Sequence, residues 1–288
     1  MQQCLGIIGG SGLYELEGLK ALEELRVQTP FGEPSDAVIR GRLDDVTLLF
    51  LPRHGRGHRL APHRINYRAN VFALKQLGAQ QLLSVSAVGS LKETIHPGDF
   101  VLVDQFIDRT RGRASTFFDD FDLVAHVGFG DPVDRALLEA SRGALEEVGA
   151  PLHLGGTYVC MEGPQFSSRA ESELYRSWGA SVIGMTNLPE AKLAREAELP
   201  YASLAMVTDY DCWHQGEEAV TVEAVIRVLQ QNVRTARAVI RALCKRLPDA
   251  RKSPTASALQ NAILTAPEHI PASTRRALAP LLAKYLPA

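Results

Sequence analysis

The chain has 288 residues, with 31 basic and 33 acidic side chains and a formal net charge of −2. Hydrophobic residues make up 45% and charged residues 22%, a balance that excludes disordered, collagen-like and coiled-coil chains. The near-neutral charge also argues against bulk binding to nucleic acid or to anionic membranes.

Short apolar runs alternate with longer helical patterns along the chain. The expected strands, in chain order, are residues 5–8, 46–51, 82–86, 100–103, 157–161, 181–185 and 202–207. Most of them are rich in Val, Ile and Leu without polar alternation, which is typical of strands covered on both faces. The expected helices are residues 67–77, 133–148, 170–178, 190–198 and 222–243. This order predicts an α/β fold with a mainly parallel central sheet flanked by helices.

Two segments and a tail interrupt the alternation. Residues 108–131 and 209–220 lack strong periodicity and are expected to be long loops. The segment PDARKSP separates a body, residues 1–247, from a helical tail, residues 248–288, in which helices are expected at 256–264 and 274–285. Residues 245–288 carry seven basic and two acidic side chains, a net +5 that leaves −7 for the rest. This asymmetry suggests a tail packed on the body or on a neighbouring subunit, or else a solvated helix pair.

Cysteine usage and targeting signals favour a cytoplasmic protein. The four cysteines are far apart in the sequence and form no C-x-x-C pair, so neither a disulfide framework nor a cysteine zinc site is expected. The N-terminus carries no basic region followed by a long apolar stretch, and there is no run of 18 apolar residues. We therefore expect no signal peptide and no membrane span.

Polar or glycine-rich residues follow nearly every expected strand, and ligands of open α/β sheets bind beyond the carboxyl ends of the strands. The first strand leads into a GGSG turn, which matches neither a P-loop nor a dinucleotide-binding pattern. Arg53 and His54 follow the second strand and suit phosphate oxygens, although a surface pair bonded to a loop carbonyl is also possible. Together with Ser11, Ser86 and Thr186, they predict an anion site without a metal.

Asp209 and Asp211 follow the most apolar strand. Further metal ligands are not evident, so we favour hydrogen bonding to a base, in which one carboxyl holds a proton for a ring nitrogen and the other accepts from an exocyclic amine. Loop capping is the commoner role of such a pair. Glu162 could accept sugar hydroxyls or cap a turn. Phe166 and Met185 could face a base and a ribose, or pack in the core.

Long stretches of the sequence resemble the purine nucleoside phosphorylase superfamily. The matching stretches are IIGGSGLYELEGL (7–19), PRHGRGH (52–58), NYRANVFALKQLG (66–78), SAVGSL (86–91), PGDFVLVDQFIDRT (97–110), the whole of 156–213, and EEAVTVEAVI (217–226). They cover most of residues 5–243, and the stretch 156–213 is the most specific. The resemblance implies a single-domain α/β fold whose mixed, mainly parallel sheet is partly closed into a barrel.

The resemblance also implies a pentosyl transfer that needs no metal and no cofactor. Phosphate, as co-substrate, attacks the anomeric carbon of 5′-methylthioadenosine and gives adenine and 5-methylthioribose 1-phosphate. The transition state resembles a ribosyl cation, so activation of the leaving group and placement of charge dominate the chemistry. The phosphate would be bound by Ser11, Arg53, His54, Ser86, the backbone of Ala87, and Thr186.

In the same family pattern Asp209 would donate a proton to the purine ring nitrogen, and Asp211 would accept from the 6-amino group. A carboxylate repels a 6-oxo group, so adenine would be favoured over 6-oxo bases. The other substrate contacts would be Val88, Phe166, the backbone of Met185, Val222, Val225, Ile226, and His126 lent by a neighbouring subunit. The resemblance implies a homotrimer, with no nucleic-acid or membrane partner.

The sequence departs from the family pattern in a few places. Ser11 and Ser86 stand where many relatives have Thr, and Val88 stands where relatives often have Cys. The tail after about residue 245 does not align. Three alternatives stay open: a broader phosphorylase for 6-amino or 6-oxo purine nucleosides, a nucleoside hydrolase, and a non-catalytic purine-binding protein. The adjacent Arg53 and His54 argue against the hydrolase.

Overall fold

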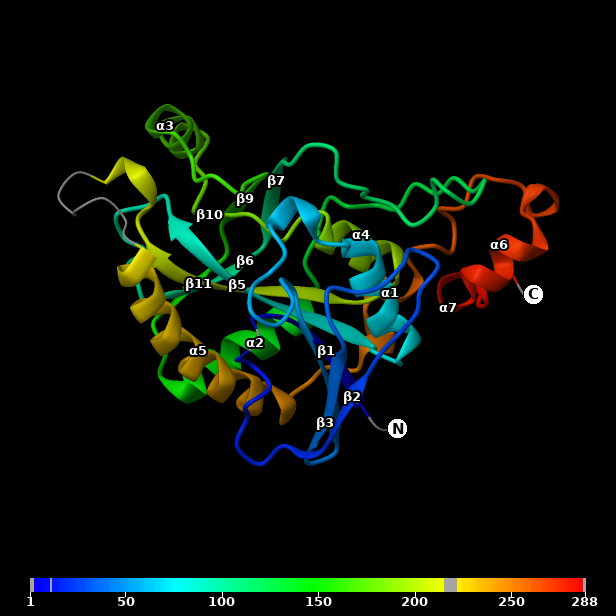
Figure 1. The fold of residues 1–288 in the computed structure, drawn as a ribbon, viewed down its shortest axis with the longest axis horizontal. Coiled ribbons are helices and arrows are strands. Elements are labelled where there is room, and N and C mark those ends of the chain that lie inside the picture. The colour runs from blue at the N-terminus through cyan, green and yellow to red at the C-terminus, as the bar shows by residue number, and fades with distance from the viewer. Residues whose placement is uncertain (1–2, 11, 215–221, 287–288) are drawn as a thin grey trace.

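The computed structural model describes residues 3–10, 12–214 and 222–286. Within these ranges eleven strands form one mixed sheet, shown in Figure 1 with helices on both of its faces. The strands are β1 (Gln3–Gly9), β2 (Lys20–Leu25), β3 (Val38–Leu43), β4 (Val46–Pro52), β5 (Gln81–Ser90), β6 (Phe100–Val103), β7 (Gln105–Arg109), β8 (Leu152–Leu154), β9 (Thr157–Met161), β10 (Val182–Gly184) and β11 (Tyr201–Asp209). The helices are α1 (Tyr67–Gln76), α2 (Arg135–Val148), α3 (Arg169–Ser177), α4 (Glu190–Glu196), α5 (Val222–Cys244), α6 (Ala272–Ala277) and α7 (Ala279–Leu282).

The sheet is mainly parallel and branches at β5. Its main path runs β2–β3–β4–β1–β5–β10–β9–β7, and β5 also pairs in parallel with β11, which continues to β6 and β8. One edge of β5 pairs with β1 as far as Ser84. At Gly89 and Ser90 the same edge pairs with β10 instead. The outer strands β2, β7 and β8 do not pair with one another in the described residues, so the sheet is not closed, unlike the partly closed barrel that we expected.

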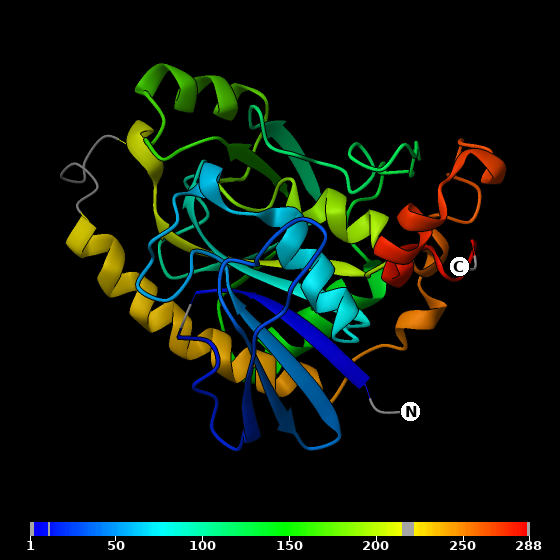
Figure 2. The same cartoon turned by 45° about the vertical axis from the view of Figure 1, so that its right-hand side comes forward.

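Successive strand residues pack against opposite layers of helices. Ile7 and Leu48 lie in a core cluster with residues of α2 and α5, whereas Ile8 and Leu49 lie in a second cluster with residues of α1 and α4. Figure 2 shows α5 running along one side of the sheet, away from α1. Both faces of the central strands are therefore covered, which explains their unbroken apolar sequences and confirms the predicted fold class.

Four strands were not predicted from the sequence. The strand β2 (KALEEL) is almost fully exposed and has no apolar run, because it pairs only with β3 at the edge of the sheet. The strand β3 contains exposed arginines, β7 is largely exposed, and β8 has three residues. The strands β2, β7 and β8 lie at edges of the sheet and β3 lies next to an edge, and such positions leave little hydrophobic signal in the sequence.

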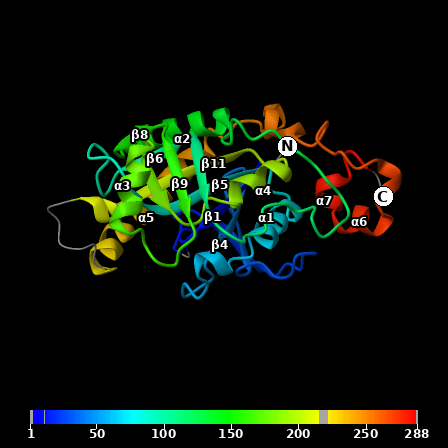
Figure 3. The same ribbon diagram turned by 90° about the horizontal axis from the view of Figure 1, so that it is seen from above.

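The tail differs from the two helices that we expected. It consists of the 3-10 turns Ala250–Lys252, Pro254–Ser257 and Pro267–His269, followed by the short helices α6 and α7. Proline begins two of these turns, and Pro280 lies in the first turn of α7, so the expected helix at 274–285 is divided. Figure 3 shows the tail at the opposite end of the molecule from α3. None of the described helices is both long and apolar enough to cross a membrane.

Candidate active site

The carboxyl ends of β1, β4, β5 and β11 meet at one edge of the sheet, as predicted from the sequence. The register places Gly9 of β1 beside Pro52 of β4, and the amide of Arg53 donates to the Gly9 carbonyl at 2.9 Å. At the neighbouring strands, Gly89 of β5 lies beside Asp209 of β11. In β5 only Ala87 is exposed, between buried residues on both sides, so the surface is open above this strand end.

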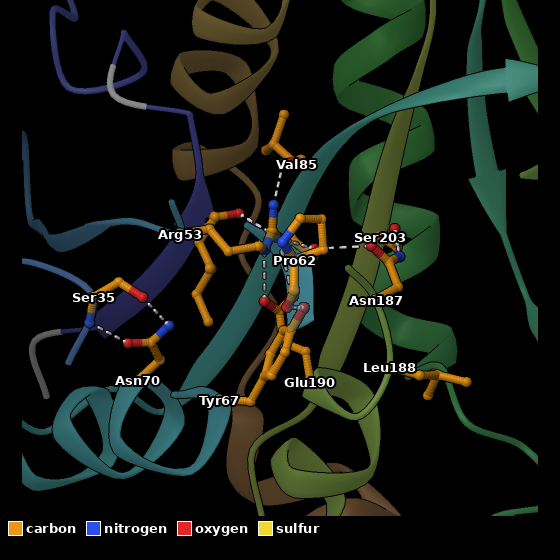
Figure 4. A network of polar contacts seen from close by, with 12 residues as sticks. Ser35, Arg53, Pro62, Tyr67, Asn70, Val85, Asn187, Leu188, Glu190 and Ser203 are labelled. Atoms are coloured by element: carbon orange, nitrogen blue, oxygen red, sulfur yellow. Dashed lines mark hydrogen bonds and ion pairs between the residues drawn. The ribbon is translucent and has the colours of Figure 1, made fainter. Parts of the chain in front are cut away.

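The Arg53 side chain is buried and joins several segments. Its Nε and Nη2 donate to both oxygens of Glu190, at 2.9 and 3.1 Å, in a salt bridge whose side chains are 3% and 1% exposed. Nη1 donates to the Val85 carbonyl at 3.1 Å, and Nη2 also donates to Ile8 O and Ser84 Oγ. Figure 4 shows the guanidinium between Val85 and Glu190. These contacts leave one Nη1 hydrogen without a partner among the described residues.

Burial and charge act in opposite directions on Arg53. Burial lowers the pKa of the guanidinium, but the Glu190 carboxylate outweighs it, and the pKa lies above its ordinary value. Arg53 is therefore always charged. Glu190, at the first turn of α4, also accepts from the Tyr201 hydroxyl at 3.0 Å. Our sequence interpretation missed Glu190, whose only signal is an acidic residue placed directly after Pro189 at the start of α4.

His54 is neutral and has a fixed tautomer. Its Nδ1 lies 2.8 Å from the Leu60 carbonyl, which can only accept, so Nδ1 carries the hydrogen. The ring stacks on His58 with centroids 4.1 Å apart. Burial, together with the charge of Arg53 and the neighbouring His58, lowers the pKa of His54 to about 4. At neutral pH His54 therefore offers an unprotonated Nε2 as a hydrogen-bond acceptor.

Ser86 and Thr186, the predicted hydroxyl donors, are both buried. The Ser86 hydroxyl has no hydrogen-bond partner among the described residues, and neither has the hydroxyl of the fully buried Tyr158. A Cβ on Gly184 would lie 2.0 Å from the Tyr158 hydroxyl, so a glycine is required there to make room for the phenol. Polar atoms without partners are rare in protein interiors, and here one belongs to a predicted anion-site residue.

Asp209 and Asp211 form a connected pair at the end of β11. The Asp211 amide donates to Asp209 Oδ1 at 2.8 Å, and the Thr208 hydroxyl bonds Asp209 Oδ2 at 2.7 Å. A Cβ at Gly89 would lie 2.9 Å from Asp209 Oδ1, so the glycine allows the strand to approach the carboxylate. Asp209 is half-buried and Asp211 is buried, with a φ of 55° that aspartate tolerates better than most residues. Asp211 also bonds Ser172, which our sequence interpretation missed.

The expected base and ribose contacts differ in exposure. Phe166 is 67% exposed, Met185 is half-buried, and Val88 is buried in the core. Arg113, which our sequence interpretation also missed, donates to the carbonyls of Met185 and Leu188 at 2.8 Å each. Its position in a segment without periodicity gave no signal in the sequence.

Arg113 also bonds Glu162, for which the sequence left two interpretations open. Its Nε donates to Glu162 Oε1 at 3.1 Å, and the amide of Arg111 donates to the other oxygen. Glu162 therefore holds the loop at residues 110–113 against the end of β9.

Some of the expected site residues lie away from this cluster, and others lie outside the residues that the structure describes. Ser11 is outside the described residues, and so are the side chains of Val222 and Val225, although both belong to α5. Ile226 on α5 is 45% exposed. His126 is exposed, and its amide donates to the carbonyl of Ala262 in the tail. Figure 1 shows the tail on the opposite side of the molecule from α3. Within one chain His126 therefore does not join the pair of aspartates.

No metal cluster is formed by the described part of the chain. The residues that the structure describes contain no group of three or more His, Cys, Asp or Glu side chains arranged to hold a metal ion. The four cysteines are free thiols, and three of them are buried. The polar groups that this edge of the sheet presents are the aspartate pair, the neutral histidine, the buried arginine and nearby hydroxyl groups.

Comparisons with known proteins converge on one family. A family model described as the phosphorylase superfamily matches residues 5–245. The chain is 54% identical to S-methyl-5′-thioadenosine phosphorylase of Geobacter sulfurreducens, over 99% of this chain and 100% of that protein. It is 57% identical to the protein of the same name from Thermosynechococcus vestitus, with the same coverage of both chains.

Solved structures give the same result. A methylthioadenosine phosphorylase from an antarctic soil metagenomic library superposes with a TM-score of 0.92 at 47% identity, covering 98% of this chain and 100% of that one. The methylthioadenosine phosphorylase of Schistosoma mansoni in complex with adenine superposes with a TM-score of 0.83 at 37% identity, covering 90% and 96%. The similarity to the first structure extends beyond the body into the tail, for which the sequence alone offered no alignment.

Proposed function

Because this chain belongs to the phosphorylase superfamily, and within it to the S-methyl-5′-thioadenosine phosphorylases, we propose that its strand-end site phosphorolyses 5′-methylthioadenosine. The bond from the anomeric carbon to the purine breaks, a phosphate oxygen bonds that carbon, and the purine leaves as adenine after gaining a proton. The products are adenine and 5-methylthioribose 1-phosphate. The observation that carries this proposal is the aspartate pair beside the open end of β5.

The base half of the site follows from that pair. Asp209, the more exposed of the two carboxyls, donates the proton to the ring nitrogen that gains electron density as the bond breaks. Asp211 accepts from the 6-amino group. Phe166 is exposed enough to pack on the base, and we assign the ribose contacts to the backbone of Met185 and to Val88. Val222, Val225 and Ile226 supply apolar surface for the methylthio group.

We assign phosphate binding to Ser11, Arg53, His54, Ser86, the Ala87 backbone and Thr186. The remaining Nη1 hydrogen of Arg53 provides a charged donor. The neutral His54 can only accept at Nε2, so it pairs with an O–H group of the hydrogenphosphate ion. The phosphate charge then lies next to the developing ribosyl cation, where it stabilises the transition state.

We further propose that the protein acts as a cytoplasmic homotrimer and needs no metal or other cofactor, since phosphate is its second substrate. His126 lies beside the tail, away from the aspartate pair of its own chain, so any contact with substrate has to come from a neighbouring copy. Light scattering coupled to gel filtration should give a mass three times that of one chain. A chelator should leave the rate of adenine release unchanged.

The reaction is tested by adenine release from 5′-methylthioadenosine. We expect release only when phosphate is present, and 5-methylthioribose 1-phosphate as the second product. Asp209→Ala should lower kcat roughly 10²- to 10⁴-fold, the usual contribution of general acid catalysis, with a modest change in binding. Equal release without phosphate would identify a hydrolase, and undiminished turnover of Asp209→Ala would remove Asp209 from the mechanism.

A further inference from the structure

Ser172 contacts one member of the carboxylate pair, Asp211. It lies on α3, is fully buried, and donates from Oγ to Asp211 Oδ2 at 2.6 Å. Asp211 in turn donates its amide to Asp209 Oδ1. The three residues therefore form one chain of hydrogen bonds that leads from the helix to the half-exposed carboxyl at the end of the strand.

The surroundings of Asp211 contain few groups that favour its charged form. Burial raises the pKa of the Asp211 carboxyl, and the charges of Asp209 and Glu171 raise it further. The Ser172 hydroxyl and the Cys212 amide act in the opposite direction. The ion pairs among the described residues do not include Asp211. Among the described residues, Ser172 therefore provides the only side-chain hydrogen bond that favours an ionised Asp211.

The position of Ser172 on its helix is set by local sequence. Ser168 caps α3 through a capping box with Glu171, whose carboxylate accepts from the amide and the hydroxyl of Ser168. Ser172 comes one turn later on the inner face, and its amide donates to the Ser168 carbonyl at 3.0 Å. The cap therefore fixes the register of the helix and so the point from which Ser172 reaches Asp211.

We propose that Ser172 is a positioning residue that keeps Asp211 ionised and thereby sets the preference for 6-amino over 6-oxo purines. This proposal rests on the function proposed above. An ionised Asp211 can only accept, so it binds the exocyclic amine and repels a carbonyl oxygen. A protonated Asp211 carries an O–H group that a 6-oxo base accepts. Removing the Ser172 hydroxyl therefore shifts base preference although both aspartates are unchanged.

The test compares kcat/KM for 5′-methylthioadenosine and 5′-methylthioinosine across the pH range in Ser172→Ala. We expect the ratio of the two values to fall about tenfold at mildly acidic pH and to recover at alkaline pH, with the acid limb of the 5′-methylthioadenosine profile raised by about one pH unit. Ser172→Thr retains the hydroxyl and should keep the wild-type ratio. Ser177→Ala is the matched control, because Ser177 lies exposed on the same helix and its hydroxyl donates only to the Leu174 carbonyl.

Several outcomes would overturn the proposal. An unchanged ratio and pH profile in Ser172→Ala, or an equal loss for both nucleosides at every pH, would leave Ser172 with a structural role only. In an Asp211→Asn background Ser172→Ala should add no further pH shift, and an additional shift there would contradict action through Asp211. Ser172→Cys retains the side-chain volume with a weaker donor, and should give a smaller shift in the same direction if the alanine variant does not fold.

A failure of the proposed reaction can be distinguished from a failure of this inference. If the wild-type protein releases no adenine from 5′-methylthioadenosine and phosphate, the proposed reaction is wrong. The choice of base is then measured by calorimetric binding of adenine and hypoxanthine to wild type and Ser172→Ala. A loss of adenine preference in the variant would still support the role of Ser172, and an unchanged preference would refute it.

Discussion

At the scale of single residues, the buried ion pair of Arg53 and Glu190 holds the strand ends in place. Arg53 follows β4 and reaches the carbonyls of Ile8 on β1 and Val85 on β5, while Glu190 begins α4. One guanidinium therefore ties three neighbouring strands to a helix behind them. Such a pair adds little net stability over apolar packing, but it is costly to break, because the remaining partner is a buried charge.

Glu190→Ala should therefore be strongly destabilising. The substitution leaves the Arg53 charge and the Tyr201 hydroxyl without their acceptor and removes buried volume. We expect the free energy of unfolding to fall by about 3–5 kcal/mol, measured by urea denaturation. Glu139→Ala, which breaks an exposed pair with Arg142, serves as the control and should cost about 0–1 kcal/mol. A loss at Glu190 no larger than in this control would mean that Arg53 finds another acceptor.

The residues of the site divide according to whether they follow a strand. Arg53, Ser86 and Asp209 stand directly after or near the ends of apolar runs, so the pattern of the sequence was enough to bring them to one edge. Glu190 and Ser172 lie on helices, and they reach the site only because the chain folds back on itself. Glu190 is 137 residues from Arg53, and Ser172 is 39 residues from Asp211. Periodicity predicts which face of a helix is inward, but not which distant side chain that face meets.

At the scale of elements, the end of α4 holds the loop that follows β7. Glu196 accepts from the Phe117 amide at 2.9 Å, and Arg195 donates to the Gly128 carbonyl at 2.7 Å and to the Asp131 carbonyl. Two consecutive residues of one helix therefore fix both halves of a segment that has little regular structure of its own. The burial of Glu196 has a cost, because it raises the pKa of this carboxyl to about 7.

The raised pKa of Glu196 predicts a pH-dependent stability. Its ordinary value is 4.5, so between about pH 4.5 and 7 the folded carboxyl retains a proton that the unfolded chain releases. Glu196 therefore contributes to the free energy of unfolding below this pH window. This contribution, up to about 3 kcal/mol, is lost as the pH rises through the window. Glu196→Gln removes the titration while keeping a carbonyl oxygen for Phe117. The Tm of the variant relative to wild type should therefore rise between pH 5 and pH 8.

The control for this prediction is Glu173→Gln, since Glu173 is exposed on α3. Its Tm difference from wild type should not change with pH over the same window. A constant difference for Glu196→Gln as well would mean that Glu196 is ionised throughout in the folded protein.

Elements were predicted well where both faces are buried and poorly elsewhere. The apolar runs of β1, β4, β5, β9 and β11 identified them, and the period of α5 identified a helix that the structure begins at Val222. The edge strand β2 was not predicted, because it has no apolar run and is largely exposed, and the expected tail helices were wrong, because prolines divide the tail at short intervals. These segments are ordered by tertiary contacts rather than by their own patterns.

At the scale of the whole molecule, the +5 of residues 245–288 and the −7 of the rest suggest an electrostatic attachment, but the contacts of the tail are mainly apolar. The buried apolar side chains of the tail are Leu259, Ala262, Ile270, Leu278, Leu281, Leu282 and Leu286, which pack in the same core cluster as residues of α1 and α4. Charged contacts also occur, since the buried Glu198 accepts from the Leu259 amide and from the hydroxyl of Tyr285, with Lys284 at 3.3 Å. Exposed ion pairs are weak, whereas a buried leucine contributes about 1.5–3 kcal/mol.

The tail should therefore be held by its leucines more than by its charges. Leu282→Ala should lower the free energy of unfolding by about 2–5 kcal/mol, the range for a leucine removed from a packed core. Arg276→Ala, which removes an exposed charge from the adjacent helix, should cost no more than about 0.5 kcal/mol.

Limited proteolysis in low and high salt separates the two modes of attachment, because salt screens exposed charges but strengthens apolar burial only slightly or not at all. Cleavage within residues 250–286 should increase in Leu282→Ala at both salt concentrations. If high salt alone exposes the tail of the wild-type protein to cleavage, and Leu282→Ala does not, then the basic tail is bound to the acidic body by charge.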